Sequence, residues 1–327
     1  MGKEALKAVM VGCGGISAAW LKALQAMQDV ELVGLVDLDE DAARQRAEEF
    51  GLTQAVIDQD LLSVLDDIGP DIVFNCTVPV AHHEVTLAAL RAGAHVLGEK
   101  PLASSLAEAR EMVEVAAKAD RIFAVIQNRR YLPAVRRLRR FIASGRIGQI
   151  TTVDSDFYIG AHFGGFRDHM AHVLLVDMAI HTFDAARYIS DADATSVYCH
   201  EWNPKGSWYD HDASAIAVFE MTDGVVYSYR GSWCSEGCQT SWESSWRVIG
   251  TKGSVLWDGY DGFEIQIVEE TGDFFSEFED VTMPPLSDED RVGGHAGVIR
   301  EFVECVHEGC MPETIGSDNI KSLAMVF

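Results

Sequence analysis

The first 128 residues alternate between short apolar runs and longer segments with apolar residues at helical spacing. The runs predict buried strands of a parallel sheet at residues 8–12, 31–37, 71–76, 95–99 and 121–127. The segments between them predict helices at residues 16–28, 40–50, 81–92 and 106–119. Strands and helices that alternate in this way are typical of a doubly wound α/β sheet. We therefore predict one α/β domain over residues 1–128.

From residue 129 to residue 327 the pattern changes, because most of the chain alternates apolar and polar positions as half-buried strands do. Strands are predicted at residues 149–158, 196–202, 214–221, 225–233, 244–249, 254–257 and 263–269. Helices are predicted at residues 131–144, 173–189, 298–307 and 317–327. Asp223 and Gly224 between two strand-like runs indicate a β-hairpin. Residues 129–327 are thus predicted to form an α+β domain with an open, mostly antiparallel sheet and helices on one face.

Composition narrows the classes of partner. Acidic residues outnumber basic ones by 51 to 26, which gives a formal net charge of -25. Such a chain repels phosphate backbones and anionic lipid, so we expect no nucleic-acid and no membrane partner. The sequence has no apolar run long enough for a transmembrane helix, and its first residues lack the apolar core of a signal peptide. The seven cysteines are scattered, which favours a reducing, cytoplasmic setting.

A glycine-rich segment, Gly-Cys-Gly-Gly-Ile-Ser at residues 12–17, lies where the first predicted strand meets the first predicted helix. The first glycine permits a tight turn, the second lets a pyrophosphate approach the backbone, and the helix N-terminus offers amide groups to that anion. Ser17 at the third position is small, so close packing of helix on strand is preserved. The segment indicates a dinucleotide site with four candidate contacts: Gly12, Gly14, Gly15 and Ile16.

Asp37 ends the second predicted strand, 25 residues after Gly12. A carboxylate at this place reaches the ribose diol of the adenosine half of a dinucleotide. Because it also repels a 2′-phosphate, NAD is favoured over NADP as the cofactor. The alternative is that Asp37 only caps the helix that follows.

Lys100 follows the fifth predicted strand in the sequence Glu-Lys-Pro. Ligands of open α/β sheets bind at the carboxyl ends of the strands, so this lysine is expected beside the reactive end of a bound dinucleotide. A lysine there can polarise a hydroxyl group or move its proton. The alternative is an ordinary solvated loop lysine.

The predicted helix at residues 173–189 is apolar nearly all round, and its polar exceptions include Asp177, His181 and Asp184 on one face. An Asp one turn before a His can hydrogen-bond the imidazole and fix its tautomer. A neutral imidazole is in turn a suitable base for an alcohol proton. The alternative is a satisfied buried pair that holds the helix in place.

The residues that precede this helix are polar and supply candidate substrate contacts: Arg167, Asp168 and His169. The histidines of this segment lack the tight spacing of metal ligands, so no metal site is predicted. Seven arginines fall within residues 129–146. In so acidic a chain they predict pairing with carboxylates, within the protein or across an oligomer interface, and a phosphate site is the weaker alternative.

Together these residues resemble the Gfo/Idh/MocA oxidoreductases, the family of glucose–fructose oxidoreductase and inositol dehydrogenase. The resemblance spans nearly the whole chain and is carried by the glycine-rich segment, by His82 and by the segments at residues 90–101, 145–148, 177–184 and 250–254. Two segments depart from the family's pattern. The lead-in to Asp177 is Met-Ala-His-Val-Leu-Leu-Val instead of a glycine-rich stretch, and the usual Thr-Pro-Asn turn after the fourth strand is Thr-Val-Pro at residues 77–79.

The resemblance implies a Rossmann domain that binds NAD, followed by an α+β domain whose open sheet often makes oligomer contacts, hence a homodimer or homotetramer. The family's catalytic trio corresponds to Lys100, Asp177 and His181. Further cofactor contacts implied by the resemblance are Thr77, His82, Glu99 and Lys100. The implied substrate site contains Lys100, Arg167, Asp168, His169 and His181.

The reaction implied by this family is oxidation of one hydroxyl of a sugar or cyclic polyol by hydride transfer to nicotinamide, or the reverse reduction. One alternative is a redox glycosidase that retains NAD and cleaves a glycosidic bond by oxidation and elimination. Another is a non-catalytic sensor that binds NAD(H). Accumulation of NADH distinguishes the first from the second, and any turnover excludes the third.

Overall fold

The computed structural model describes residues 4–327 of the chain. It divides into two compact units, one made of the chain up to Asn128 together with Gly293–Met325, the other of Arg129–Val292. The N-terminal segment, where no signal peptide is expected, includes residues 1–3, which lie outside the described residues. No helix of the described part is long and apolar enough to cross a membrane.

The first unit is built on a six-stranded parallel sheet with the strand order β3-β2-β1-β4-β5-β6. Its strands are β1 (Leu6–Val11), β2 (Val30–Val36), β3 (Val56–Asp58), β4 (Ile72–Asn75), β5 (His95–Gly98) and β6 (Phe123–Val125). Its helices are α1 (Ser17–Leu24), α2 (Glu40–Glu49), α3 (Leu61–Ile68), α4 (His82–Arg91), α5 (Leu106–Ala119), α8 (His295–Glu308) and α9 (Gly316–Ala324). This is the strand order of dinucleotide-binding Rossmann domains, so the predicted doubly wound sheet is confirmed.

Burial explains why the strands of this sheet appear as continuous apolar runs. β4 is buried at all its positions, and β1 is buried from Ala8 onward. A parallel strand covered by helices on both faces has no solvent side, so its sequence does not alternate. Gly51 and Gly93 adopt positive φ angles of 67° and 88° just after α2 and α4, where helix ends favour glycine.

The sequence did not indicate β3 and α3, because β3 has only three residues and none of them is fully buried. The end of the chain also differs from expectation. Residues 293–325 pack with the first unit, although the predicted second domain runs from 129 to 327. Helix α8 contacts α1 and β5, and the ring of its Phe302 lies 6.5 Å from that of Phe74 in β4. The helix therefore covers part of the Rossmann sheet with its buried face.

The second unit contains an eight-stranded sheet in the order β14-β13-β12-β11-β7-β10-β9-β8. Its strands are β7 (Ile150–Tyr158), β8 (Ala194–Trp202), β9 (Ser214–Met221), β10 (Val226–Ser232), β11 (Ser245–Gly250), β12 (Gly253–Trp257), β13 (Phe263–Glu270) and β14 (Glu277–Asp280). β7 and β10 pair in parallel, and the other neighbours pair antiparallel. Asp223 and Gly224 have positive φ angles of 58° and 75° at the turn between β9 and β10, which confirms the predicted hairpin.

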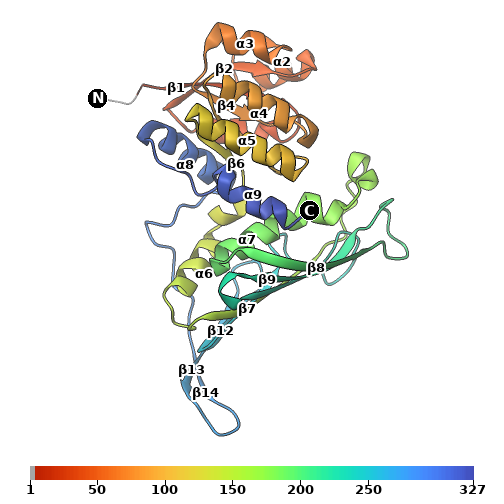
Figure 1. Ribbon diagram of the computed structural model, residues 1–327, viewed down its shortest axis with the longest axis vertical. Helices are drawn as coiled ribbons and strands as arrows, with labels where there is room; N and C mark the ends of the chain where they lie inside the picture. The colour runs from red at the N-terminus through yellow and green to blue at the C-terminus, as the bar shows by residue number, and fades with distance from the viewer. Residues whose placement is uncertain (1–3) are drawn as a thin grey trace. The chain divides into compact units, whose positions relative to one another are not determined.

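Helices α6 (Pro133–Ala143) and α7 (Ile180–Ser190) cover one face of this sheet (Figure 1). The predicted helix at residues 173–189 is divided, because Leu174–Ala179 is π-helical and α7 begins directly after it. π-helical turns are rare and concentrate at functional sites. The irregular turn carries Asp177, and the first turn of α7 carries His181.

The arginine-rich segment forms ion pairs inside the second unit, as the sequence predicted. The pairs are Arg129–Glu243, Arg130–Asp184, Arg139–Asp191, Arg140–Asp290 and Arg146–Glu279. They tie the beginning of the unit to segments as distant in sequence as the loop after β14. The arginines therefore serve the packing of this unit, which removes the main reason for a phosphate site.

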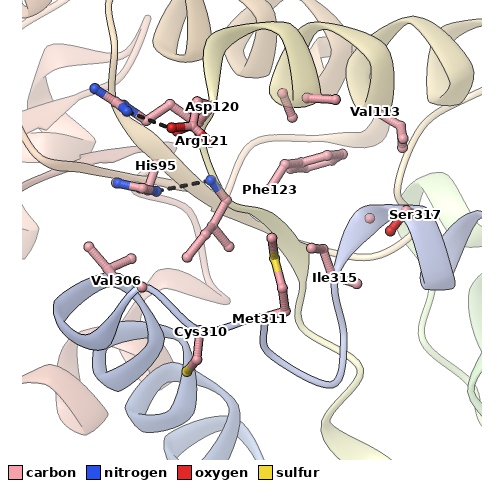
Figure 2. A pocket seen from close by; sticks show the side chains of 15 residues that line it. His95, Val113, Asp120, Arg121, Phe123, Val306, Cys310, Met311, Ile315 and Ser317 are labelled. Atoms are coloured by element: carbon pink, nitrogen blue, oxygen red, sulfur yellow. Dashed lines mark hydrogen bonds between the residues drawn. The ribbon is translucent and has the colours of Figure 1, made fainter.

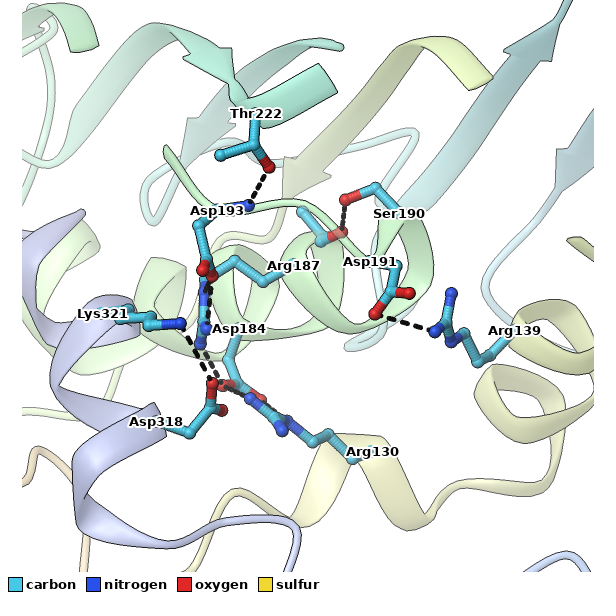
Figure 3. Close-up of polar contacts among 11 residues, drawn as sticks. Arg130, Arg139, Asp184, Arg187, Ser190, Asp191, Asp193, Thr222, Asp318 and Lys321 are labelled. Atoms are coloured by element: carbon cyan, nitrogen blue, oxygen red, sulfur yellow. Dashed lines mark hydrogen bonds and ion pairs between the residues drawn. The ribbon is translucent and has the colours of Figure 1, made fainter. Parts of the chain in front are cut away.

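Asp184, one of the polar residues singled out on the predicted helix, is a structural group. Its two carboxylate oxygens accept from Nε and Nη2 of Arg130 at 2.8 and 2.7 Å, as Figure 3 shows. Asp184 is 0% exposed and Arg130 6% exposed. The pair is therefore a buried, two-pronged ion pair, which matches the alternative of a satisfied buried group for this residue.

We expect Asp184→Asn to lower the free energy of unfolding by about 3–5 kcal/mol, because it removes a fully buried carboxylate charge that faces the buried guanidinium groups of Arg130 and Arg187. Urea denaturation followed by circular dichroism measures the change. Asp191→Asn is the matched control, because Asp191 also pairs with an arginine but its side chain is 78% exposed. This control should change stability by less than about 1 kcal/mol. Equal effects of the two changes would refute a special role for burial.

Candidate functional site

The glycine-rich turn between β1 and α1 has the shape that a dinucleotide requires. Gly12 has a φ angle of +92°, and a Cβ atom there would lie 2.6 Å from the carbonyl carbon of Cys76. A Cβ on Gly14 or Gly15 would meet nothing within 4 Å, so the space above them is open to a pyrophosphate. Among the described residues, no side chain caps the N-terminus of α1 next to Ile16. Backbone amides at this position favour an anion.

Asp37 lies at the end of β2 and is joined to the glycine-rich turn. Its Oδ2 accepts from the backbone N–H of Cys13 at 2.6 Å, and its Oδ1 accepts from that of Asp39 at 2.9 Å. The helix that follows is capped by Asp39, whose side chain accepts from Asp41. The alternative reading of Asp37 as the cap of that helix is therefore wrong. Burial, with the nearby Asp37, raises the pKa of the Cys13 thiol to about 12 and keeps it neutral.

Arg46 of α2 is hydrogen-bonded to the glycine-rich turn, and no sequence motif predicted this contact. Its Nε donates to Ser17 Oγ at 3.1 Å and its Nη2 donates to the carbonyl oxygen of Gly14 at 3.2 Å. Ser17 Oγ itself donates to the same carbonyl at 2.6 Å. The serine at the third motif position is thus a hydrogen-bonded bridge as well as a small residue.

His82 connects the loop after β4 with the loop after β5. Its Nδ1 lies 2.8 Å from the carbonyl oxygen of Pro101, and its Nε2 lies 3.0 Å from that of Thr77. The side chain is 1% exposed, and this burial lowers the pKa of the imidazole. Thr77 in turn packs closely against Gly12. A Cβ atom on that glycine would lie only 2.7 Å from the backbone N of Thr77.

Glu99 supports the backbone of Lys100. One of its carboxylate oxygens accepts from the indole N–H of Trp20 at 2.8 Å, and the other accepts from the backbone N–H of Lys100 at 3.1 Å. Glu99 and Trp20 are buried, and Lys100 is half-buried. The predicted cofactor residues of the first unit therefore meet at the carboxyl edge of one sheet, and their order along it matches the binding edge of Rossmann domains.

In the second unit, His181 lines a small cavity with an ion pair and three tryptophans. The pair is Arg129 with Glu243, and the tryptophans are Trp242, Trp246 and Trp257. Burial lowers the pKa of the Arg129 guanidinium to about 10. The sequence did not indicate these tryptophans, Arg129 or Glu243 as neighbours of His181.

Arg167, Asp168 and His169 lie on a short 3₁₀ helix, Gly165–His169, and the structure gives them different partners. Arg167 makes a two-pronged contact with Asp177. His169 is exposed, and its hydrogen bond of 2.6 Å to Asp210 raises the pKa of its imidazole. Asp168 has a buried Oδ1 that receives no hydrogen bond from residues 4–327.

The histidines before α7 each pair with a separate carboxylate. The pairs are His162–Glu236, His169–Asp210 and His172–Glu201. Within the described residues there is no group of three or more His, Cys, Asp and Glu side chains that could hold a metal ion.

A cavity of about 630 Å³ lies elsewhere in the first unit, between the end of α5, the start of β6 and the segment that joins α8 to α9. Figure 2 shows His95 and Phe123 among its lining residues. His95 is the first residue of β5, whereas Lys100 follows the end of the same strand. The cavity is therefore at the amino edge of the sheet and does not belong to the cofactor edge.

Two cysteines depart from the expectation of reduced, separate thiols. Cys305 near the end of α8 forms a disulfide with Cys310, five residues later. The other five cysteines are free. A five-residue separation carries no known motif, so this pairing was not indicated by the sequence.

Residues 6–127 match the sequence model described as "Oxidoreductase family, NAD-binding Rossmann fold", and residues 135–256 match "GFO/IDH/MocA C-terminal domain". The chain is 26% identical over 338 residues to a myo-inositol 2-dehydrogenase of Thermotoga maritima, with 97% of this chain and 92% of the relative covered. A crystal structure of an oxidoreductase from Agrobacterium radiobacter with NAD+, L-tartaric acid and magnesium superposes with a TM-score of 0.83 at 21% identity, covering 98% and 94%. Levoglucosan dehydrogenase with NADH and levoglucosan gives 0.81 at 21% identity, covering 99% and 95%.

Proposed function

Because this chain belongs to the GFO/IDH/MocA oxidoreductase family and contains its NAD-binding Rossmann domain, we propose that it oxidises a hydroxyl group of a sugar or cyclic polyol, or catalyses the reverse reduction. The observation that carries the proposal is the continuous assembly at the carboxyl edge of the first sheet. It joins the turn at Gly12 through Thr77 and His82 to the Glu-Lys-Pro segment. A cofactor loop and a candidate catalytic lysine are thus held in one scaffold.

When bound, NAD supplies the redox chemistry by accepting a hydride. In the proposed reaction His181 takes the proton of the substrate hydroxyl, and Asp177 orients the imidazole and balances its charge. Lys100 polarises the reacting oxygen and can relay its proton. The reaction requires the amine of Lys100 and the imidazole of His181 to meet at one alcohol group.

The cofactor contacts that we propose are those of the carboxyl edge. Gly14, Gly15 and Ile16 face the pyrophosphate, and Asp37 accepts from the ribose diol, which favours NAD over NADP. Thr77, His82 and Glu99 shape the loops around the cofactor. Asp168 and His169 are proposed substrate contacts on the short helix Gly165–His169, where the His169 side chain is exposed.

Two relatives support the substrate class, since one is named for myo-inositol and the other was crystallised with levoglucosan.

We propose that the chain works as a homodimer or homotetramer through the sheet face opposite α6 and α7. On that face Tyr198, Ile216 and Val218 are exposed apolar residues. We also propose a cytoplasmic location, which fits the five free thiols, although the Cys305–Cys310 disulfide departs from that setting.

A panel of sugars and inositols with NAD, followed at the NADH absorbance band, tests the function. We expect at least one member to be oxidised with net accumulation of NADH, because a dehydrogenase releases reduced cofactor. The keto forms of the same sugars and inositols, incubated with NADH, test the reverse direction. Complete inactivity in both directions, with NAD binding shown by calorimetry, would refute the proposed oxidation and favour the sensor.

The redox glycosidase is the second enzymatic candidate. Glycosides added to the panel test it: such an enzyme would cleave them while the total of NADH stays constant, because the cofactor is reduced and reoxidised within each cycle. Chromatography of released sugars alongside the absorbance measurement separates the two activities.

A further inference from the structure

Arg167 is the residue whose contacts differ most from what the sequence indicated. The sequence offered it as a substrate contact, yet its guanidinium engages Asp177 in the same unit. Nε donates to Asp177 Oδ2 at 2.8 Å, and Nη2 lies 3.4 Å from Oδ1. The side chain of Asp177 is 12% exposed and that of Arg167 32% exposed. A two-pronged contact of this kind fixes the plane of a carboxylate as well as its place.

The guanidinium also contacts two aromatic rings. Its Cζ lies 5.0 Å from the ring centre of Phe163 and 4.8 Å from that of Phe166. Such cation–π contacts favour one orientation of the side chain. Arg167 therefore contacts two aromatic rings while two of its nitrogens face Asp177.

The loop that carries Arg167 is in turn bonded to a second loop, at residues 203–211. The carbonyl oxygen of Ala161 accepts from Trp208 Nε1 at 3.1 Å and from the Tyr209 hydroxyl at 2.9 Å. The backbone N–H of Asp210 donates to the carbonyl oxygen of Asp168 at 2.8 Å. The structure joins the two loops to each other and, through Arg167, to Asp177.

We propose that Arg167 is the positioning residue of Asp177: it orients the carboxylate that serves His181, and the two bonded loops hold it there. This inference rests on the proposed oxidation of an alcohol.

Kinetics of a double-mutant cycle test the role. The set is wild type, Arg167→Met, Asp177→Asn and the double variant, with Arg167→Lys added. If Arg167 acts through Asp177, Arg167→Met lowers kcat about 10- to 100-fold while KM for a neutral polyol hardly changes. Arg167→Lys should recover only part of kcat, because an ammonium cannot make the two-pronged contact. In the Asp177→Asn background, Arg167→Met should cause no further loss.

Arg139→Met is the matched control. Arg139 also pairs with an aspartate of the second unit and its side chain is 24% exposed, but its partner Asp191 follows α7 at the other end from His181. This variant should retain the wild-type kcat. Losses that multiply in the double variant, or an increase in KM confined to sugar acids, would show that Arg167 contacts the substrate and would overturn the proposal.

The contact itself is tested without any substrate. Urea denaturation of the same four proteins gives the coupling between Arg167 and Asp177, which should be favourable and exceed the error of the measurement. Strictly additive effects on stability would overturn the positioning role even in an active enzyme. If no polyol is oxidised but the coupling is present, the proposed oxidation fails while the contact stands, so the two failures are distinguishable.

Discussion

Lys100→Met should lower kcat at least about 100-fold while NAD still binds, because the variant removes the amine that we propose polarises the reacting hydroxyl and relays its proton. The change is nearly isosteric. The backbone of this residue is held by Glu99, whose carboxylate accepts from the Lys100 N–H at 3.1 Å. The loop should therefore keep its shape when the amine is lost. Initial rates with the best substrate of the panel, and calorimetry with NAD, measure the two quantities.

Lys118→Met is the control for this variant, since Lys118 is an exposed lysine of α5 in the same unit. It should retain full activity. Near-normal turnover of Lys100→Met would remove the lysine from the mechanism. Loss of NAD binding in step with loss of activity would instead assign Lys100 to the cofactor site alone.

The second large effect is expected at the glycine-rich turn, where Gly12→Ala should weaken NAD binding about 10- to 100-fold. The added methyl group would lie 2.6 Å from backbone atoms of Cys76 and 2.7 Å from the backbone of Thr77. Forcing a carbon atom into close-packed backbone costs about 1–3 kcal/mol, which is relieved when the turn moves away from the binding geometry. Calorimetric titration with NAD measures the affinity.

Gly51→Ala separates this steric effect from backbone strain. Gly51 also has a positive φ angle, +67°, but a Cβ atom there meets nothing within 4 Å. Gly51→Ala should lower thermal stability through strain alone and leave NAD affinity unchanged. Equal loss of affinity in the two variants would show that the close approach to Cys76 has no part in cofactor binding.

The two domains differ in how their patterns translate into structure. β1 and β4 appear in the sequence as continuous apolar runs, because helices cover both faces of the first sheet. β9 alternates instead, because one face of the second sheet packs under α6 and α7 while Ile216 and Val218 on the other face stay exposed. In each case the strand pattern reports which faces are buried.

Residues brought from distant parts of the chain were not predictable in the same way. Arg46 reaches Ser17 across 29 residues, and Arg129 forms its ion pair with Glu243 more than a hundred residues later. Nothing local in the sequence marks either arginine as part of a site. The partner of a long, flexible arginine side chain depends on which acceptor groups the folded backbone brings within its reach.

The chain by itself determined the Rossmann sheet, the place of the glycine-rich turn and the identity of Lys100, Asp177 and His181 as candidates, because periodicity and short motifs are local properties. Tertiary structure decided the rest. Asp184 pairs with Arg130, and Arg167 pairs with Asp177. Leu174–Ala179 forms a π-helical turn, and α8 packs with the first unit. These outcomes depend on which buried charges find partners and which apolar faces find cover, and both are settled only when the whole unit is packed.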